Sequence, residues 1–89
     1  MLLPPYPNQF NPSVTIRFAL PGRADVRLVV YDVQGRCVRE LVRCAVPAGF
    51  HDAEWDGKDA SGLTVSSGIY ILKLTAGNRS AIRKATLLR

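Results

Sequence analysis

The segment WDGKDASGLTVSSGIYILKL, residues 55–74, decides the fold class of this 89-residue chain. It starts at the aromatic end of one strand, passes through an acidic loop interrupted by glycines, and enters a second apolar strand at Gly68. No part of it has the 3.6-residue spacing of apolar positions that marks an amphipathic helix. The order of strand, Gly-rich turn and strand is typical of a small all-β domain.

The rest of the chain repeats this pattern. In residues 14–20, Ile16, Phe18 and Leu20 alternate with small or polar residues, which indicates a half-buried strand. Turn residues recur at short intervals, and Gly35 is expected to supply the positive φ of a hairpin loop at 32–35. The strands predicted in this way cover residues 14–20, 25–31, 36–43, 50–55, 69–75 and 79–88, with a short one at 63–65. We therefore predict an all-β fold, an immunoglobulin-like antiparallel β-sandwich of about seven strands.

The chain is expected to form one domain, since chains of this length rarely divide. The proline-rich residues 1–12 are predicted to be an extended lead-in segment packed on the sandwich, with Tyr6 and Phe10 capping one end of the core. Residues 13–89 are predicted to form the sandwich itself. The first residues do not resemble a secretory signal, and no apolar run reaches the roughly 20 residues of a membrane helix.

The net charge of +5 does not predict nucleic-acid binding. Basic residues are spread through the predicted strands, and no aromatic and basic platform for stacking bases is visible. The charges are nonetheless uneven. Acids are concentrated between Asp52 and Asp59, whereas the charged residues of 78–89 are all basic.

The sequence predicts no enzyme and no cofactor. His51 is the single histidine, and no pattern places it beside a nucleophile and an orienting acid. Cys37 and Cys44 are predicted to be free thiols, because one extended strand would hold them about 20 Å apart, beyond the reach of a disulfide. Two cysteines and one histidine without C-x₂-C spacing are also too few for a structural zinc site.

Two further features have a structural and a functional interpretation. Asp56 and Asp59 could bind calcium, but Lys58 departs from the calcium-loop pattern, so we expect the carboxylates to accept backbone N–H bonds in a turn. Trp55 could stack on a sugar ring. Because its strand alternates with acids on the opposite side, we expect Trp55 to point into the core.

The chain resembles the C-terminal sorting domains of type IX secretion substrates, and the related immunoglobulin-like domain of the flagellar hook-capping protein. The resemblance lies in YPNQFNPSVTIRF (residues 6–18), VYDVQGRCVREL (30–41), PAGFHDAEWDGKDASG (47–62), VSSGIYILKL (65–74) and RKATLLR (83–89). The motifs follow the family order and cover nearly the whole chain. Residues that fill its structural positions are Tyr6, Pro7, Asn8, Phe10, Asn11, Pro12, Gly35, Trp55, Asp56, Gly57, Gly62, Gly68 and Tyr70.

The resemblance implies a non-catalytic domain that directs a larger protein through an outer-membrane translocon to the cell surface or medium by way of the periplasm. Its partners would be the translocon, a sortase and an upstream passenger protein. The positions that such machinery would read are Lys84, Leu87, Leu88 and Arg89. Two alternatives remain at this stage: a hook-cap-like module that acts in assembly, and a carbohydrate-binding or adhesive module.

Overall fold

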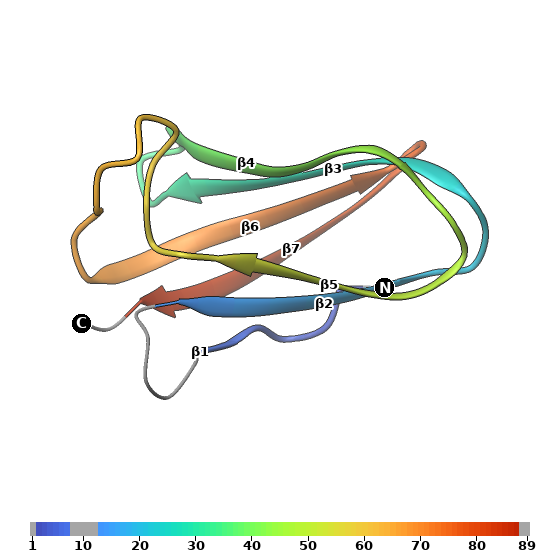
Figure 1. Cartoon of the computed structure of the whole chain (residues 1–89), viewed down its shortest axis with the longest axis horizontal. Helices are drawn as coiled ribbons and strands as arrows, with labels where there is room; N and C mark the ends of the chain where they lie inside the picture. The colour runs from blue at the N-terminus through green and yellow to red at the C-terminus, as the bar shows by residue number, and fades with distance from the viewer. Residues whose placement is uncertain (1, 8–12, 88–89) are drawn as a thin grey trace.

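The structure, a computed structural model, describes residues 2–7 and 13–87, with the backbone alone at Tyr6 and Pro7. Its strands are β1 (Tyr6–Pro7), β2 (Val14–Leu20), β3 (Ala24–Asp32), β4 (Cys37–Val46), β5 (Gly49–Trp55), β6 (Gly68–Ala76) and β7 (Arg79–Leu87). They form two antiparallel sheets, of order β1-β2-β5 and β4-β3-β6-β7, which face each other (Figure 1). The predicted immunoglobulin-like β-sandwich is therefore confirmed.

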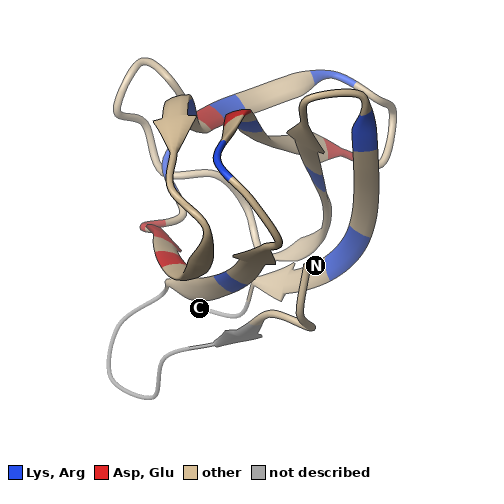
Figure 2. Ribbon diagram, turned by 90° about the vertical axis from the view of Figure 1, so that its right-hand side faces the viewer, with Lys and Arg blue, Asp and Glu red and all other residues tan. Residues whose placement is uncertain are grey.

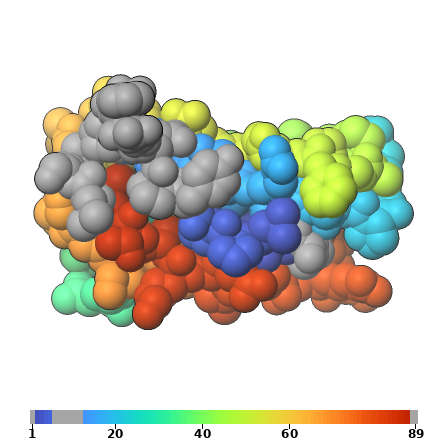
Figure 3. All heavy atoms as spheres, turned by 90° about the horizontal axis from the view of Figure 1, so that it is seen from below, coloured from blue at the N-terminus to red at the C-terminus, as the bar shows by residue number. Residues whose placement is uncertain are grey.

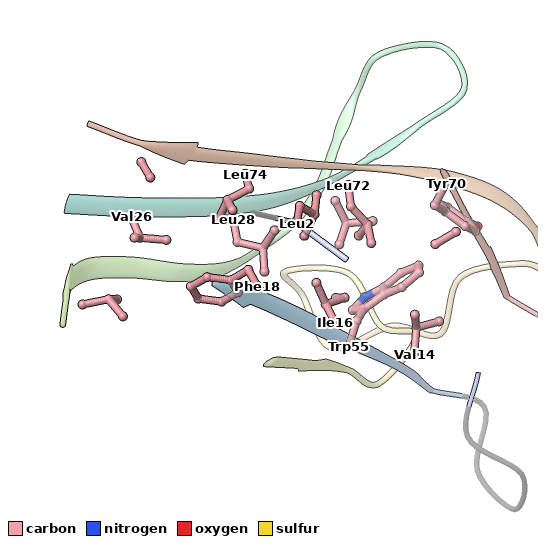
Figure 4. Close-up of a cluster of buried hydrophobic side chains, with 14 of the residues drawn as sticks. Leu2, Val14, Ile16, Phe18, Val26, Leu28, Trp55, Tyr70, Leu72 and Leu74 are labelled. Atoms are coloured by element: carbon pink, nitrogen blue, oxygen red, sulfur yellow. The ribbon is translucent and has the colours of Figure 1, made fainter. Parts of the chain in front are cut away.

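Side chains from the inner faces of both sheets fill the space between them (Figure 4). Alternation along β2 buries the three apolar residues predicted for it, and β3, β6 and β7 contribute in the same way. Trp55 is completely buried, as expected from the acids on the other side of β5. Each large apolar side chain buried in this way contributes about 1.5–3 kcal/mol to folding. The core residues are Leu2, Val14, Ile16, Phe18, Leu20, Val26, Leu28, Val30, Val46, Trp55, Tyr70, Leu72, Leu74, Ala76, Ala85 and Leu87.

Strand β4 is longer than predicted and less regular. The sequence pattern ended it at Arg43, but it continues to Val46 because residues 44–46 pair with the start of β3. Register shifts interrupt the ladder between Leu28 and Val29 and between Val30 and Tyr31. Such bulges twist the strand, and most of β4 is half-buried or exposed.

The lead-in segment is anchored by a residue that the sequence did not single out. Leu2 is 2% exposed and belongs to the core, while the Leu3 backbone N–H donates to the Arg17 carbonyl at 2.9 Å. From β7, the Arg83 Nε donates to the Leu2 carbonyl at 3.0 Å, so Leu2 and Leu3 lie across the seam between β2 and β7 (Figure 3). The predicted capping by Tyr6 and Phe10 lies outside what the structure describes, as do Asn8, Asn11 and Pro12.

The loops also correct one prediction and confirm another. Residues 63–65 form no strand of their own; Thr64 makes an isolated bridge to Lys58 instead. The Val65 N–H donates to the Gly57 carbonyl beside this bridge, and the chain reverses at Gly62, which has φ +83°. Gly35 has φ +85°, as predicted for the hairpin loop that joins β3 and β4. Among the described residues there is no helix long and apolar enough to span a membrane.

Candidate functional site

The predicted terminal recognition motif is divided between the surface and the core. Strand β7 forms one edge of the four-stranded sheet, and Lys84 lies exposed on its outer side. Leu87 is 1% exposed and packs in the core, so a partner could not contact it while the domain stays folded. Leu88 and Arg89 lie outside the described residues.

The block from Trp55 to Tyr70 is a structural anchor. The two aromatic rings meet edge to face, with centroids 4.9 Å apart and planes at 70°. The Trp55 Nε1 donates to the Lys58 carbonyl at 2.9 Å, and the Tyr70 hydroxyl donates to the Ser66 carbonyl at 2.6 Å. The Trp55 Nε1–H and the Tyr70 hydroxyl thus each fix one end of the loop at 56–67, while the two rings fill the core. With both rings buried, neither offers a flat surface to a sugar.

The acidic loop uses its carboxylates to shape the backbone. The Asp56 Oδ1 accepts the Lys58 N–H at 3.1 Å and the Arg39 Nη1 at 2.9 Å. The Asp59 Oδ1 accepts the Ser61 and Leu63 N–H groups at 2.9 and 3.0 Å. Gly57 and Gly62 take φ of +77° and +83°, where a side chain would be strained. Among the described residues, no group of three or more His, Cys, Asp or Glu could hold a metal ion. The hydrogen bonds that Asp56 and Asp59 accept are those expected of a turn.

His51 lies on β5, whereas Cys37 and Cys44 both lie on β4. The His51 Nε2 lies 2.7 Å from the Pro47 carbonyl, and its ring packs 5.5 Å from that of Phe18. Cys37 and Cys44 are both exposed free thiols, as predicted. In the β3–β4 ladder they lie opposite Tyr31 and Val26, toward the two ends of β3.

Ion pairs with carboxylates neutralise much of the arginine charge. Arg17, Arg27, Arg36, Arg39 and Arg43 each lie within 4 Å of a carboxylate, and all five pairs are at least partly exposed. The hydrogen bond from Arg17 lowers the pKa of Asp52, and backbone and side-chain bonds from Arg36 lower that of Asp32. The hydrogen bond to Glu40 raises the pKa of Arg27. These surface pairs stabilise the protein only slightly.

A shallow hollow of about 700 Å³, which the sequence did not predict, lies at the loop end of the sandwich. Its apolar wall comes from Val33, Val38, Val65 and Ile69, and Asp32 and Arg36 pair with each other at its rim. Because that carboxylate is already held by an arginine and two backbone N–H groups, it is poorly placed to act as a base. The hollow therefore offers a surface for contact and no evident reactive group.

The fold and these loops define an immunoglobulin-like module, and comparison with known proteins assigns its family. Residues 9–80 match the FlgD Ig-like domain, and the chain belongs to this family. The basal-body rod modification protein FlgD of Salmonella typhimurium is 42% identical over 53 residues, and its Salmonella typhi counterpart is equally similar. The match covers 60% of this chain but only 23% of either relative.

Solved structures agree with this assignment. FlgD from P. aeruginosa superposes with a TM-score of 0.68 at 26% identity, covering 84% of this chain and 60% of that one. FlgD from Xanthomonas campestris, whose structure was described for its insights into hook capping, gives 0.68 at 27% identity, covering 97% and 63%. PorZ, a surface component of the type IX secretion system of Porphyromonas gingivalis, shares the fold with a TM-score of 0.63 at 19% identity over 11% of its length. The resemblance to the hook-capping protein is thus supported by sequence and by structure. The resemblance to sorting domains is supported by the fold shared with PorZ.

Proposed function

We propose that this domain is a hook-cap-like structural module that acts in protein assembly and performs no catalysis. The observation that carries the proposal is the family match over residues 9–80, which runs from before β2 into β7 and includes the loops at 32–35 and 56–67. Of the two alternatives to the sorting function, this is the one that the sequence relatives favour. The module would form part of a longer protein, as the corresponding region does in the relatives.

The physical character of the domain fits such a role. The rings of Trp55 and Tyr70 are buried, and the carboxylates of Asp56 and Asp59 between them in the sequence accept backbone N–H bonds in turns. The surface also exposes several large apolar side chains, which are available for contact with another protein. They are Leu3, Val33, Phe50, Leu63, Ile69 and Ile82.

A domain replacement tests this function. This chain would replace the matching domain in FlgD of Salmonella typhimurium, and hooks would be counted by electron microscopy alongside swimming assays. We expect the chimera to form hooks. A chimera carrying Trp55→Ala, which removes the core anchor, should form none. If the unmodified chimera is folded and stable in the cell but hooks are absent, the assembly function is wrong.

Sorting by a type IX-like translocon is the second candidate, with delivery to the cell surface or medium through a translocon and a sortase. The observation that favours it is the position of β7 at a sheet edge with Lys84 exposed, since an edge strand can be recognised by strand addition. The experiment must leave the buried core residues of β7 in place. Deleting residues 84–89 would also remove Ala85 and Leu87, which are 3% and 1% exposed, and would unfold the domain.

A reporter fused upstream of the domain, expressed in a host with type IX machinery, separates recognition from folding. The test variant combines Lys84→Ala with removal of residues 88–89. Its matched control is Arg79→Ala, an exposed basic residue at the other end of β7. Loss of surface delivery in the test variant alone would support sorting. Equal delivery by the wild type and both variants would rule out this motif as the signal.

A further inference from the structure

Two strands of the sandwich carry matching rows of side chains on their outer faces. On β7, Ile82 is 60% exposed and Lys84 follows it two positions later. On β5, Phe50 is 72% exposed, and Asp52 and Glu54 follow at the same spacing. Alternate residues of a strand project to the same face, so each row is continuous. One row is apolar and basic, and the other is apolar and acidic.

The two rows lie on opposite sides of the molecule. Strand β7 ends the order of one sheet and β5 ends the order of the other. In the end-on view, β7 with its basic residues and β5 with its acidic residues lie on opposite sides of the sandwich (Figure 2). Side chains on one domain therefore cannot pair across these rows, but two separate domains can bring them together.

The charges at the two rows are available for such a contact. Lys84 and Glu54 have no ion-pair partner among the described residues. Asp52 pairs with Arg17 at 2.8 Å, but both side chains are about half exposed. Lys73, which lies opposite Ile82 in the β6–β7 ladder, adds beside the basic row a second cation without an ion-pair partner in the described part of the chain. Charge complementarity at a contact favours specific association over random collision.

We propose that the domain binds a second copy of itself head to tail, with the β7 row (Ile82, Lys84) of one copy against the β5 row (Phe50, Asp52, Glu54) of the next. This inference rests on the proposed assembly function and names its partner and surfaces. Because the two rows differ, the contact is heterologous, and repeated contacts extend into a ring or a filament. The apolar residue of each row supplies the area removed from water, and the charges select the partner row.

A charge exchange tests the proposal with the purified 89-residue chain. Lys84→Glu makes both rows acidic, and Glu54→Lys replaces the unpaired acid of the β5 row with a cation that repels Lys84, so each single variant should associate at least about tenfold more weakly than the wild type. The double variant Lys84→Glu, Glu54→Lys exchanges the two unpaired charges, so that they again attract each other, and leaves the net charge at +5. Sedimentation velocity over a concentration series measures the association. Both residues are exposed, so thermal unfolding should be nearly unchanged in every variant.

Arg23→Glu is the matched control for Lys84→Glu, since it makes the same change of charge in the turn between β2 and β3, at a residue that belongs to neither row. We expect it to associate like the wild type. Mixing the two single variants should also restore association, because each supplies the row that the other lacks. A wild-type chain that stays monomeric at every concentration, or a double variant as weak as the singles, overturns the proposal. A monomeric chain that still supports hook formation in the domain replacement overturns this inference and leaves the assembly function standing.

Discussion

The loops at 32–36 and 59–63 have one local design and two different settings. Each begins with Asp, whose Oδ1 accepts the N–H groups two and four residues later at 2.9–3.0 Å. In each, the Asp carbonyl accepts from the glycine three residues on, at 3.0 Å, and the Asp N–H donates to the carbonyl four residues on. The glycines, Gly35 and Gly62, have φ of +85° and +83°. The spacing D-x-x-G is the sequence signal that they share.

What supports the two turns is different. The loop at 32–36 joins β3 and β4, whose ladder continues from it along the sheet. The loop at 59–63 joins no named strands and depends on side chains and single backbone bonds. Trp55 holds the Lys58 carbonyl from the core side, and the Ala60 N–H donates to the Val38 carbonyl of β4 at 3.1 Å.

This difference shows that the same turn chemistry can be stabilised by a strand ladder or by a buried aromatic anchor. It also predicts that the two loops respond differently to mutation. Removing the anchor should release the second loop and spare the first, whereas changes within the turns should have similar effects in both.

The largest effect is expected at the anchor. Trp55→Ala should lower the free energy of unfolding by about 3–5 kcal/mol, because it leaves a cavity in the core and loses the bond to Lys58. Urea denaturation measures it. Trp55→Phe is the sharper variant, since it keeps an aromatic ring and should cost about 1–2 kcal/mol. In that variant, amide exchange should speed up at Ala60 and stay slow at Gly35. Equal protection at both would contradict the anchor.

The glycines come next. Gly35→Ala and Gly62→Ala should each cost about 1–2 kcal/mol, because alanine is strained at these positive φ values. In both places an added Cβ would meet open space, so strain is the whole cause. Asn, which tolerates this conformation better, should cost less at either site. The measurement is the unfolding midpoint in urea. A much smaller loss at Gly62 would mean that its loop opens before the sandwich unfolds.

A pH series sharpens the comparison at Asp32. The backbone hydrogen bond from Arg36 holds the pKa of this carboxyl below its usual 3.8 in the folded protein. Its contribution to stability is therefore complete above about pH 4 and is lost as the pH falls through the lowered pKa. Asp32→Asn cannot ionise, so wild type and variant should differ most near neutral pH and converge in acid. Thermal unfolding between pH 7 and pH 2 measures the difference. A gap that widens in acid would contradict the sign.

The smallest effect concerns the arginine beside the second loop. Arg39 Nη1 lies 2.9 Å from the Asp56 Oδ1 and 3.4 Å from the Lys58 carbonyl, and the pair is partly exposed. Arg39→Ala should lower stability by about 0.5–1 kcal/mol, and added salt should reduce the loss. The control is Arg43→Ala on the same strand, whose pair with Glu40 is 3.8 Å long. A loss above 2 kcal/mol at Arg39 would show that it, and not Trp55, holds the loop.

Much of the candidate site could be predicted because its causes are local. Alternation placed Trp55 in the core and the neighbouring acids outside, and the turn residues placed the acidic loop. The burial of Leu87 and the exposure of Lys84 within the terminal motif follow from the alternation along β7, so this part of the site could be predicted. The hollow at the loop end and the anchoring of Leu2 could not be predicted, because each depends on segments far apart in the chain.

The amino-acid sequence by itself determined the strands β2 to β7 apart from the end of β4, their inward faces and the positive φ of Gly35. Those properties follow from side-chain alternation within seven or so residues and from the backbone freedom of glycine. The tertiary structure alone decided that β4 extends to Val46, that Leu2 lies across the seam, and that the basic and acidic rows lie on opposite sides. Which strand ends each sheet depends on the pairing of distant segments, and a pattern of period two is the same whichever neighbour a strand takes.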